Sequence, residues 1–159
     1  SHVFLGCSYG GYVAFEMARI VQEAGHDSVA ILLDSDGTND QTILDQITPV
    51  SLAVFRQKLI TYNGMYPHID DQQIDRYFRV YNHHLTTLKT MSLANTKAKT
   101  ILVLATGDKS PAYMQSLTDY WSEKVETGLV VEKVEGDHST MLEAPSILKV
   151  AEIIRAELN

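Results

Sequence analysis

A glycine-serine-glycine motif near the start of the chain constrains the fold more than any other feature. The motif reads G-x-S-x-G at Gly6-Cys7-Ser8-Tyr9-Gly10, between a short apolar stretch and apolar residues at helical spacing. A sharp turn from a strand into a helix lifts a serine hydroxyl clear of the backbone and holds it against a base. Glycines at positions 6 and 10 would allow that turn without side-chain clashes. We therefore interpret Ser8 as a candidate nucleophile on a strand-turn-helix elbow.

Short apolar runs alternate with helical patterns along the whole chain. Runs of this length are typical of strands covered on both faces of a parallel sheet, and they lie at residues 2–5, 29–33, 101–105 and 129–134. A first helix has apolar positions at Val13, Ala14, Met17, Ala18, Val21 and Ala24, with Gly25 closing it. A last helix begins near Pro145 and has on one face Ile147, Leu148, Ala151, Ile154 and Leu158. The alternation predicts an α/β fold with a mostly parallel sheet and flanking helices.

A long segment, residues 39–98, separates the second predicted strand from the third. It contains two helical stripes, one with Val50, Ala53, Val54 and Ile60, and a stronger one with Ile74, Tyr77, Phe78, Tyr81, Leu85, Leu88 and Met91. The segment is either an extra helical layer on the sheet or a lid that lines a pocket for an apolar chain. Its position after the C-terminal end of a strand fits a lid.

Composition narrows the class of protein. With 159 residues, 45% of them hydrophobic, the chain suits one globular domain or a large part of one. A net charge of −7 gives no electrostatic driving force for nucleic-acid binding. Neither a membrane-spanning run nor a secretory leader is apparent, so we expect a soluble, cytoplasmic protein. One cysteine, Cys7, and no H-E-x-x-H spacing argue against an internal disulfide and against a metal site.

Polar residues follow the C-terminal ends of the predicted strands, where open α/β sheets build their sites. They are Ser8, Asp34, Asp108 and His138. The order serine, acid, histidine is that of the α/β-hydrolases. His138 is the candidate base, and Asp34 and Asp108 compete for the role of the acid.

Three blocks of sequence resemble the thioesterase domains of fatty acid, polyketide and non-ribosomal peptide synthases, which belong to the α/β-hydrolase superfamily. The blocks are residues 6–18, residues 32–35, and Glu135-Gly136-Asp137-His138 with the five residues that follow. Ser-Tyr-Gly at the elbow and the Glu-Gly-Asp-His block are particularly similar to the thioesterase domain of animal fatty acid synthase.

The resemblance implies roles for the site residues. It places the acid at Asp34, with Asp108 as the alternative, and makes His138 the base that activates Ser8. The substrate is then a long acyl chain bound as a thioester to the phosphopantetheine of an acyl carrier protein domain, and the enzyme needs no cofactor of its own. The backbone N–H of Tyr9 is one expected oxyanion donor. The second donor is expected on a loop after an earlier strand.

That earlier loop is not in this sequence, so we expect the chain to be the C-terminal part of such a domain. The N-terminal strands of the fold would then be absent from this chain, and the missing N-terminal part of the same domain would be a partner of it. Without it, the strands at residues 2–5 and 29–33 are expected to leave sheet surface uncovered.

Other readings stay open at this point. The bound acyl product could be released by hydrolysis or by macrocyclisation, as in polyketide and non-ribosomal peptide synthases. A general lipase or esterase and a non-catalytic remnant or interaction module are further alternatives. Docking of an acidic carrier protein would need a basic patch, for which Lys89, Lys97 and Lys99 are candidates, although they equally fit a solvated face.

Overall fold

The structure, a computed structural model, describes residues 1–62 and 64–158, which fold into two compact units. One unit comprises Ser1–Thr38 and the chain from Leu93 onward, and it contains the sheet. The other unit, Asn39–Ser92, is helical. Within the described residues, no helix is long and apolar enough to cross a membrane.

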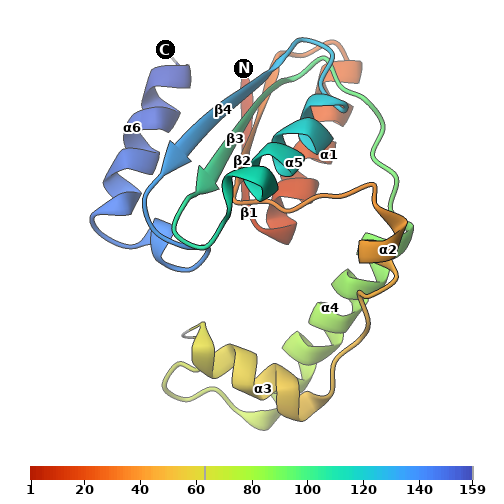
Figure 1. Cartoon of the computed structure of the whole chain (residues 1–159), viewed down its shortest axis with the longest axis vertical. Helices are drawn as coiled ribbons and strands as arrows, with labels where there is room; N and C mark the ends of the chain where they lie inside the picture. Colours follow the sequence, from red (N-terminus) through yellow and green to blue (C-terminus); the bar gives the residue numbers. More distant parts are fainter. Residues whose placement is uncertain (63, 159) are drawn as a thin grey trace. The chain divides into compact units, whose positions relative to one another are not determined.

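A parallel sheet forms the centre of the first unit (Figure 1). In the described part of the chain its strand order is β1-β2-β3-β4, and the strands are β1 (His2–Cys7), β2 (Ser28–Leu33), β3 (Lys99–Ala105) and β4 (Leu129–Val134). Helices α1 (Tyr9–Glu23) and α5 (Pro111–Ser122) lie on one face, and α6 (Ser146–Leu158) lies on the other. The predicted α/β fold with a parallel sheet and flanking helices is therefore confirmed.

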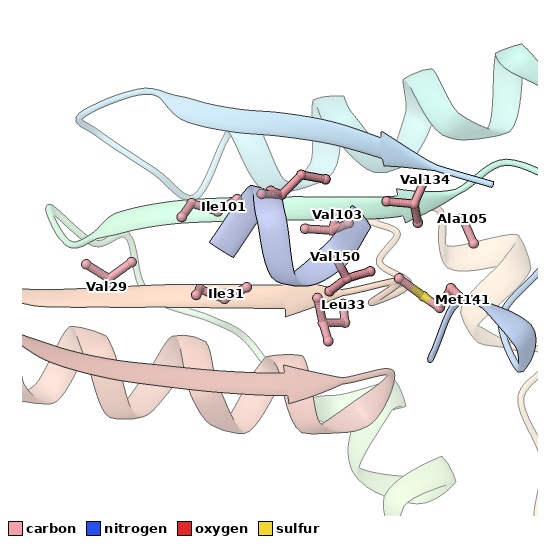
Figure 2. Close-up of a cluster of buried hydrophobic side chains, with 10 residues drawn as sticks. Val29, Ile31, Leu33, Ile101, Val103, Ala105, Val134, Met141 and Val150 are labelled. Atoms are coloured by element: carbon pink, nitrogen blue, oxygen red, sulfur yellow. The ribbon is translucent and has the colours of Figure 1, made fainter. Parts of the chain in front are cut away.

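The face of the sheet under α6 is packed with branched side chains (Figure 2). Alternate residues of β2 and β3 point to this side because side chains alternate along a strand. Val150 and Ile153 of α6 pack on them, and Met141 of the 3-10 helix η1 (Thr140–Leu142) closes the cluster near the strand ends. The buried members are Val29, Ile31, Leu33, Ile101, Val103, Ala105, Val134, Met141, Val150 and Ile153.

Aromatic residues fill the opposite face, between α1 and α5. The rings of Tyr12 and Phe15 lie 5.2 and 5.4 Å from the fully buried Trp121 of α5. The indole Nε1 of Trp121 donates a hydrogen bond of 3.0 Å to the carbonyl of Ser35. Because Ser35 follows β2, this bond ties α5 to the loop at the carboxyl end of the sheet.

The buried faces of two helices agree with the predicted ones only in part. In α1 the predicted Ala14 and Ala18 are buried, as are Tyr12 and Phe15, whereas Val13 and Met17 are 49% and 46% exposed. In α6 the predicted Ile147 and Ile154 pack against the core. In the same helix, Leu148 is 65% exposed and Ile153 is buried. Both helices are apolar around much of their circumference, so spacing alone could not identify the side that meets the sheet. The predicted end of α1 is confirmed, since Gly25 has φ +87° and the chain leaves the helix with Schellman hydrogen bonds.

The predicted exposure of the first two strands is half right. Val3 and Leu5 of β1 are 44% and 51% exposed. They pair in register with Val29 and Ile31, on the face under α6, but they are not among the side chains packed in that cluster. In contrast, every residue of β2 is buried. The expectation for residues 29–33 is wrong because β2 lies between β1 and β3 and has helices over both of its faces.

The helical unit contains α2 (Gln41–Leu44), α3 (Leu52–Thr61) and α4 (Asp71–Thr90). The buried ring of Phe55 in α3 lies 5.8 Å from Phe78 and 5.3 Å from Tyr81, both in α4. The side-chain amide of Asn82 also bonds both backbone groups of Val50, at 2.8 and 3.0 Å. These contacts hold α3 against α4 within this unit.

Candidate active site

The elbow motif forms the predicted turn from a strand into a helix. β1 ends at Cys7, α1 begins at Tyr9, and Ser8 lies between them with φ +54° and ψ −125°. A positive φ is uncommon for a residue with a side chain and persists only where the surroundings impose it. Here the N–H of Ser8 donates to the carbonyl of Leu33 in β2 at 2.9 Å, and the carbonyl of Ser8 accepts from Gly11 at 3.0 Å.

Of the two glycines expected to be required around Ser8, Gly6 is confirmed and Gly10 is not. A Cβ at Gly6 would overlap the backbone of Gly10 and Gly11 in the first turn of α1. At Gly10, a Cβ would meet no described atom within 4 Å. Gly11 is the second position that requires glycine, because a Cβ there would overlap the side chain of Ser35. The tight approaches are therefore at Gly6 and Gly11, and the expectation for Gly10 is wrong.

Substitution at these positions should separate the two kinds of glycine. We expect Gly6→Ala to destabilise the fold by roughly 1–3 kcal/mol, since backbone atoms would have to move. Gly10→Ala should be neutral or slightly stabilising, since alanine favours helix and the position is open. Urea unfolding of both variants measures the difference, and equal stabilities would contradict the assignment.

Main-chain hydrogen bonds fix the start of the loops at the carboxyl edge of the sheet. The N–H of Ser8 donates to the carbonyl of Leu33, as described above. In the same way, the N–H of Asp34 donates to the carbonyl of Val103 at 2.8 Å, and the N–H of Thr106 donates to the carbonyl of Val134 at 3.0 Å. Each bond runs from the residue after one strand to the next strand. The polar residues that follow the strands are thus brought to one edge, as the strand pattern predicts.

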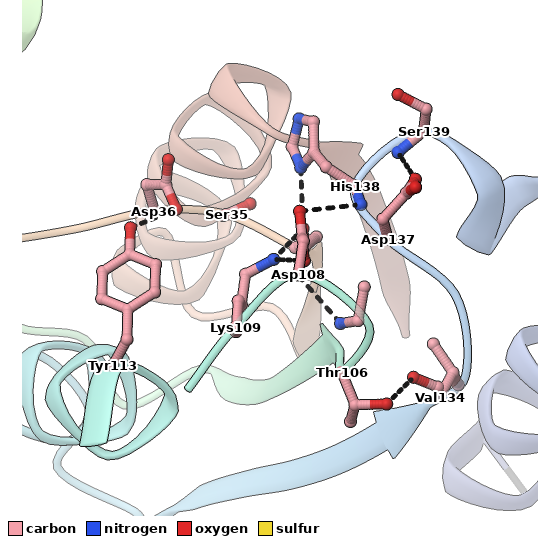
Figure 3. Close-up of polar contacts among 12 residues, drawn as sticks. Ser35, Asp36, Thr106, Asp108, Lys109, Tyr113, Val134, Asp137, His138 and Ser139 are labelled. Carbon is pink, nitrogen blue, oxygen red and sulfur yellow. Dashed lines mark hydrogen bonds and ion pairs between the residues drawn. The ribbon is translucent and has the colours of Figure 1, made fainter. Parts of the chain in front are cut away.

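Lys109, Asp108 and His138 lie close together at this edge (Figure 3), and Asp34 contacts both Lys109 and His138. The side chain of Asp34 is fully buried, and its φ is +49°. Oδ1 accepts the N–H of Ala105 at 2.9 Å. Oδ2 lies 2.7 Å from Nδ1 of His138 and 2.7 Å from Nζ of Lys109.

The charge states of Asp34 and His138 follow from the groups around them. Burial by itself would raise the pKa of Asp34, but the hydrogen bonds from His138, Lys109 and Ala105 outweigh it and hold that pKa below its usual range. The hydrogen bond to Asp34 raises the pKa of His138 above its ordinary value, against the opposing effect of burial. Asp34 is therefore a carboxylate that favours the protonated imidazole, as an acid that supports a histidine base must.

His138 is presented by a loop that Asp137 shapes. Oδ1 of Asp137 accepts the N–H groups of Ser139 and Thr140, both at 2.9 Å. Gly136, with φ +99°, turns the chain just before it. The ring of His138 is 34% exposed, so the base can reach a substrate while Nδ1 is held by the buried carboxylate.

Asp108, the alternative acid, does not contact the imidazole ring in the described structure. Its Oδ2 accepts the backbone N–H of His138 at 3.3 Å, and its Oδ1 lies 2.9 Å from Nζ of Lys109. The N-cap of the helix that follows, α5, is Ser110, whose side chain accepts the N–H of Tyr113. The geometry therefore favours Asp34 over Asp108 as the partner of His138.

Ser8 and His138 are not joined by a hydrogen bond within the described residues. The serine follows β1 and the histidine follows β4, so the two groups reach the same sheet edge from different strands. Catalytic hydrogen bonds are often long without substrate and tighten in the Michaelis complex. The structure thus brings Asp34 and His138 into direct contact, and it places Ser8 at the same edge.

Lys109 is a site residue that the sequence pattern does not reveal. Lysine is most often solvent-exposed, so a lysine next to Asp108 gave no sign that its side chain would be only 5% exposed beside Asp34. The position of Lys109, shortly after the predicted strand at residues 101–105, was the one sequence feature that could have indicated a place near the site. Among the described residues, no group of three or more His, Cys, Asp and Glu could hold a metal ion.

The parallel sheet with helices on both faces matches the α/β-hydrolase-type fold of solved thioesterase domains. The chain belongs to the thioesterase domain family, whose profile matches residues 2–158. Members of this family are hydrolases that act on thioesters. No curated protein sequence matches the chain significantly.

Several solved thioesterase domains share the fold. The Vlm2 thioesterase domain bound with a dodecadepsipeptide is 18% identical with a TM-score of 0.75, and the match covers 96% of this chain and 67% of that one. SrfTE, described as the thioesterase domain that cyclises the lipopeptide antibiotic surfactin, is 20% identical (TM-score 0.66; 99% and 67% covered). The NocB thioesterase domain in covalent complex with a fluorophosphonate nocardicin G analogue is 21% identical with a TM-score of 0.68, and the match covers 98% of this chain and 64% of that one. The chain thus spans about two thirds of the length of these domains.

Proposed function

We propose that this chain releases an acyl chain from the phosphopantetheine thioester of an acyl carrier protein domain, through a covalent ester on Ser8. The observation that carries the proposal is the 2.7 Å contact between the buried Asp34 and Nδ1 of His138, at the sheet edge where the Ser8 elbow ends. Family membership supplies the thioester bond as the class of substrate. No cofactor takes part in this scheme.

In the proposed reaction, His138 acts through Nε2 because its Nδ1 faces Asp34. It removes the proton from Ser8, whose Oγ attacks the thioester carbonyl to form a tetrahedral oxyanion. Collapse of this intermediate expels the pantetheine thiol, which takes the proton from His138. Water activated by His138 then attacks the serine ester and releases the acid. Asp34 holds the imidazole in the correct tautomer and stabilises its protonated form.

The backbone N–H of Tyr9 is the proposed oxyanion donor. Tyr9 is the first residue of α1 and directly follows the nucleophile. The positive end of the helix dipole favours a negative charge at this point.

We assign the helical unit, Asn39–Ser92, the role of a lid for the acyl chain. Its position in the chain directly after the β2 loop and its exposed Ile60, Tyr66 and Tyr77 support that role.

Two kinds of parent synthase fit this proposal. The similarity of the elbow and of the Glu-Gly-Asp-His block to animal fatty acid synthase favours a chain-terminating thioesterase that produces a free fatty acid. The solved relatives include a thioesterase domain bound with a dodecadepsipeptide and one that cyclises a lipopeptide, which favours a peptide or polyketide synthase. In the second case an internal nucleophile of the bound chain could replace water, and the product would be a macrocycle.

Fluorophosphonate labelling and thioester turnover test the proposed function together. We expect the protein to be labelled at Ser8 and to hydrolyse acyl-pantetheine thioesters in preference to simple p-nitrophenyl esters. Preference for the simple esters would indicate a general esterase instead. Failure of the protein both to react with the probe and to hydrolyse thioesters would support the non-catalytic alternative. Mass spectrometry of the product from a hydroxyacyl thioester distinguishes hydrolysis from cyclisation.

A further inference from the structure

Lys109 is an almost fully buried lysine that the proposed reaction does not use. Its side chain is 5% exposed, and Nζ lies 2.7 Å from Oδ2 of Asp34 and 2.9 Å from Oδ1 of Asp108. A lysine is rarely buried unless its charge is paired. Here the ammonium group is placed between two carboxylates, one of which contacts His138.

Lys109 and His138 share one oxygen of Asp34. Nζ and Nδ1 each lie 2.7 Å from Oδ2, while Oδ1 accepts the N–H of Ala105. A carboxylate oxygen has two lone pairs and can accept both donors. The described donors come from the end of β3, from the loop after it, and from the loop after β4. The Asp34 carboxylate is thereby fixed in position and orientation relative to the imidazole.

The shared oxygen also has an electrostatic consequence. Asp34 stabilises the protonated imidazole, whereas the positive charge of Lys109 at the same oxygen opposes it. In the folded protein, the hydrogen bond to Asp34 raises the pKa of His138 and the charge of Lys109 lowers it. Asp108 compensates part of the lysine charge, and through Oδ2 it also holds the backbone N–H of His138.

We propose that Lys109 is a positioning residue that fixes the Asp34 carboxylate against His138 and limits how strongly this carboxylate stabilises the protonated imidazole. A general base is most effective when it is neutral near the working pH and still basic enough to accept a proton. A carboxylate paired only with histidine would favour the protonated, inactive form over a wider pH range. Only the consequence for turnover rests on the proposed function, because the charge state of His138 can be measured without it.

Other charged or titratable groups also face this pair. They are Asp36 after β2, Asp137 in the histidine loop, Cys7 of β1 and Tyr113 of α5, in addition to Asp34, Asp108 and Lys109. Asp36 acts on His138 in the same direction as Asp34. Lys109 is the cation that opposes these carboxylates among the described groups acting on His138.

Titration of the His138 imidazole by NMR tests the inference. Lys109→Met removes the charge and keeps the length of the side chain, and we expect it to raise the pKa of His138 by roughly one unit. Lys109→Gln, which retains a hydrogen-bond donor, should give a shift in the same direction and serves if the methionine variant does not fold. Lys149→Met is the matched control, since Lys149 is 61% exposed on α6 and its loss changes the net charge equally.

A His138 pKa that is unchanged or lower in both Lys109 variants would overturn the inference, and so would an equal rise in Lys149→Met. The acid limb of the pH profile of kcat/KM should move upward with the NMR value, whereas a purely structural role would lower the activity without moving that limb. If the protein hydrolyses thioesters but the titration does not shift, only the role of Lys109 fails. If the titration shifts but no thioester is hydrolysed, the proposed function fails and the role of Lys109 in the pair stands.

Discussion

Replacement of Ser8 by alanine is expected to lower kcat for thioester hydrolysis by about 10⁴- to 10⁶-fold and to abolish fluorophosphonate labelling. The variant lacks the oxygen that forms the ester, while Asp34 and His138 keep their contact. The strained backbone at position 8 should be preserved, because its hydrogen bonds to Leu33 and Gly11 involve main-chain atoms and alanine keeps the Cβ. Turnover of an acyl-pantetheine substrate, with thermal unfolding measured in parallel, gives the comparison.

Ser116→Ala is a suitable control for that experiment. Ser116 lies exposed on α5, and its hydroxyl donates to the carbonyl of Tyr113 within the same helix. The control should keep wild-type turnover and labelling. A Ser8→Ala protein that turns over thioesters at the wild-type rate would show that Ser8 is not the nucleophile.

Asp34→Asn should have the second largest effect, a fall in kcat of about 10⁴-fold, because an amide neither stabilises the protonated imidazole nor holds its correct tautomer. Asp108→Asn is the matched variant and should retain most of the activity, since Asp108 contacts the backbone N–H of His138 and Lys109 but not the imidazole. Parallel kcat measurements separate the two acids. A larger loss in Asp108→Asn would reverse the assignment.

Replacement of Asp34 by asparagine also has a pH signature in stability. The pKa of Asp34 is lowered in the folded protein, so its stabilising contribution is present above the unfolded pKa and is lost as the pH falls through the folded one. Wild type should therefore exceed Asp34→Asn in unfolding free energy at neutral pH. The difference should shrink well below pH ~3.9, the ordinary value for aspartate. Urea unfolding at the two pH values measures it.

The strands and the edge that bears the site could be predicted from sequence because continuous apolar runs mark strands buried on both faces. Residues 29–33 and 101–105 are such runs, and the polar residues directly after them must lie at one edge of a parallel sheet. The spacing of the residues could not decide between Asp34 and Asp108 as the acid, because both residues follow predicted strands. It depends on which carboxylate faces the imidazole, and that is fixed by the loop conformations, including the positive φ of Asp34.

The errors share a physical cause. The buried sides of α1 and α6, the need for glycine at Gly11 rather than Gly10, and the burial of Lys109 all depend on which neighbour a side chain meets in space. Ser35 shows this best, since it lies far along the chain from Gly11 yet occupies the space a Cβ would need. The periodicity of apolar residues describes one helix or strand at a time, and it carries no information on contacts between side chains of different elements.

The main-chain bonds that join Ser8 to Leu33, Asp34 to Val103 and Thr106 to Val134 also bear on how such a site can diversify. Hydrogen bonds between backbone groups are available to nearly every residue type. The positions from which Ser8 and Asp34 extend are therefore set largely by the sheet register. Side chains beyond the tight contacts of Gly6 and Gly11 can change in size and polarity over generations, altering what is accepted, while these two groups keep their places.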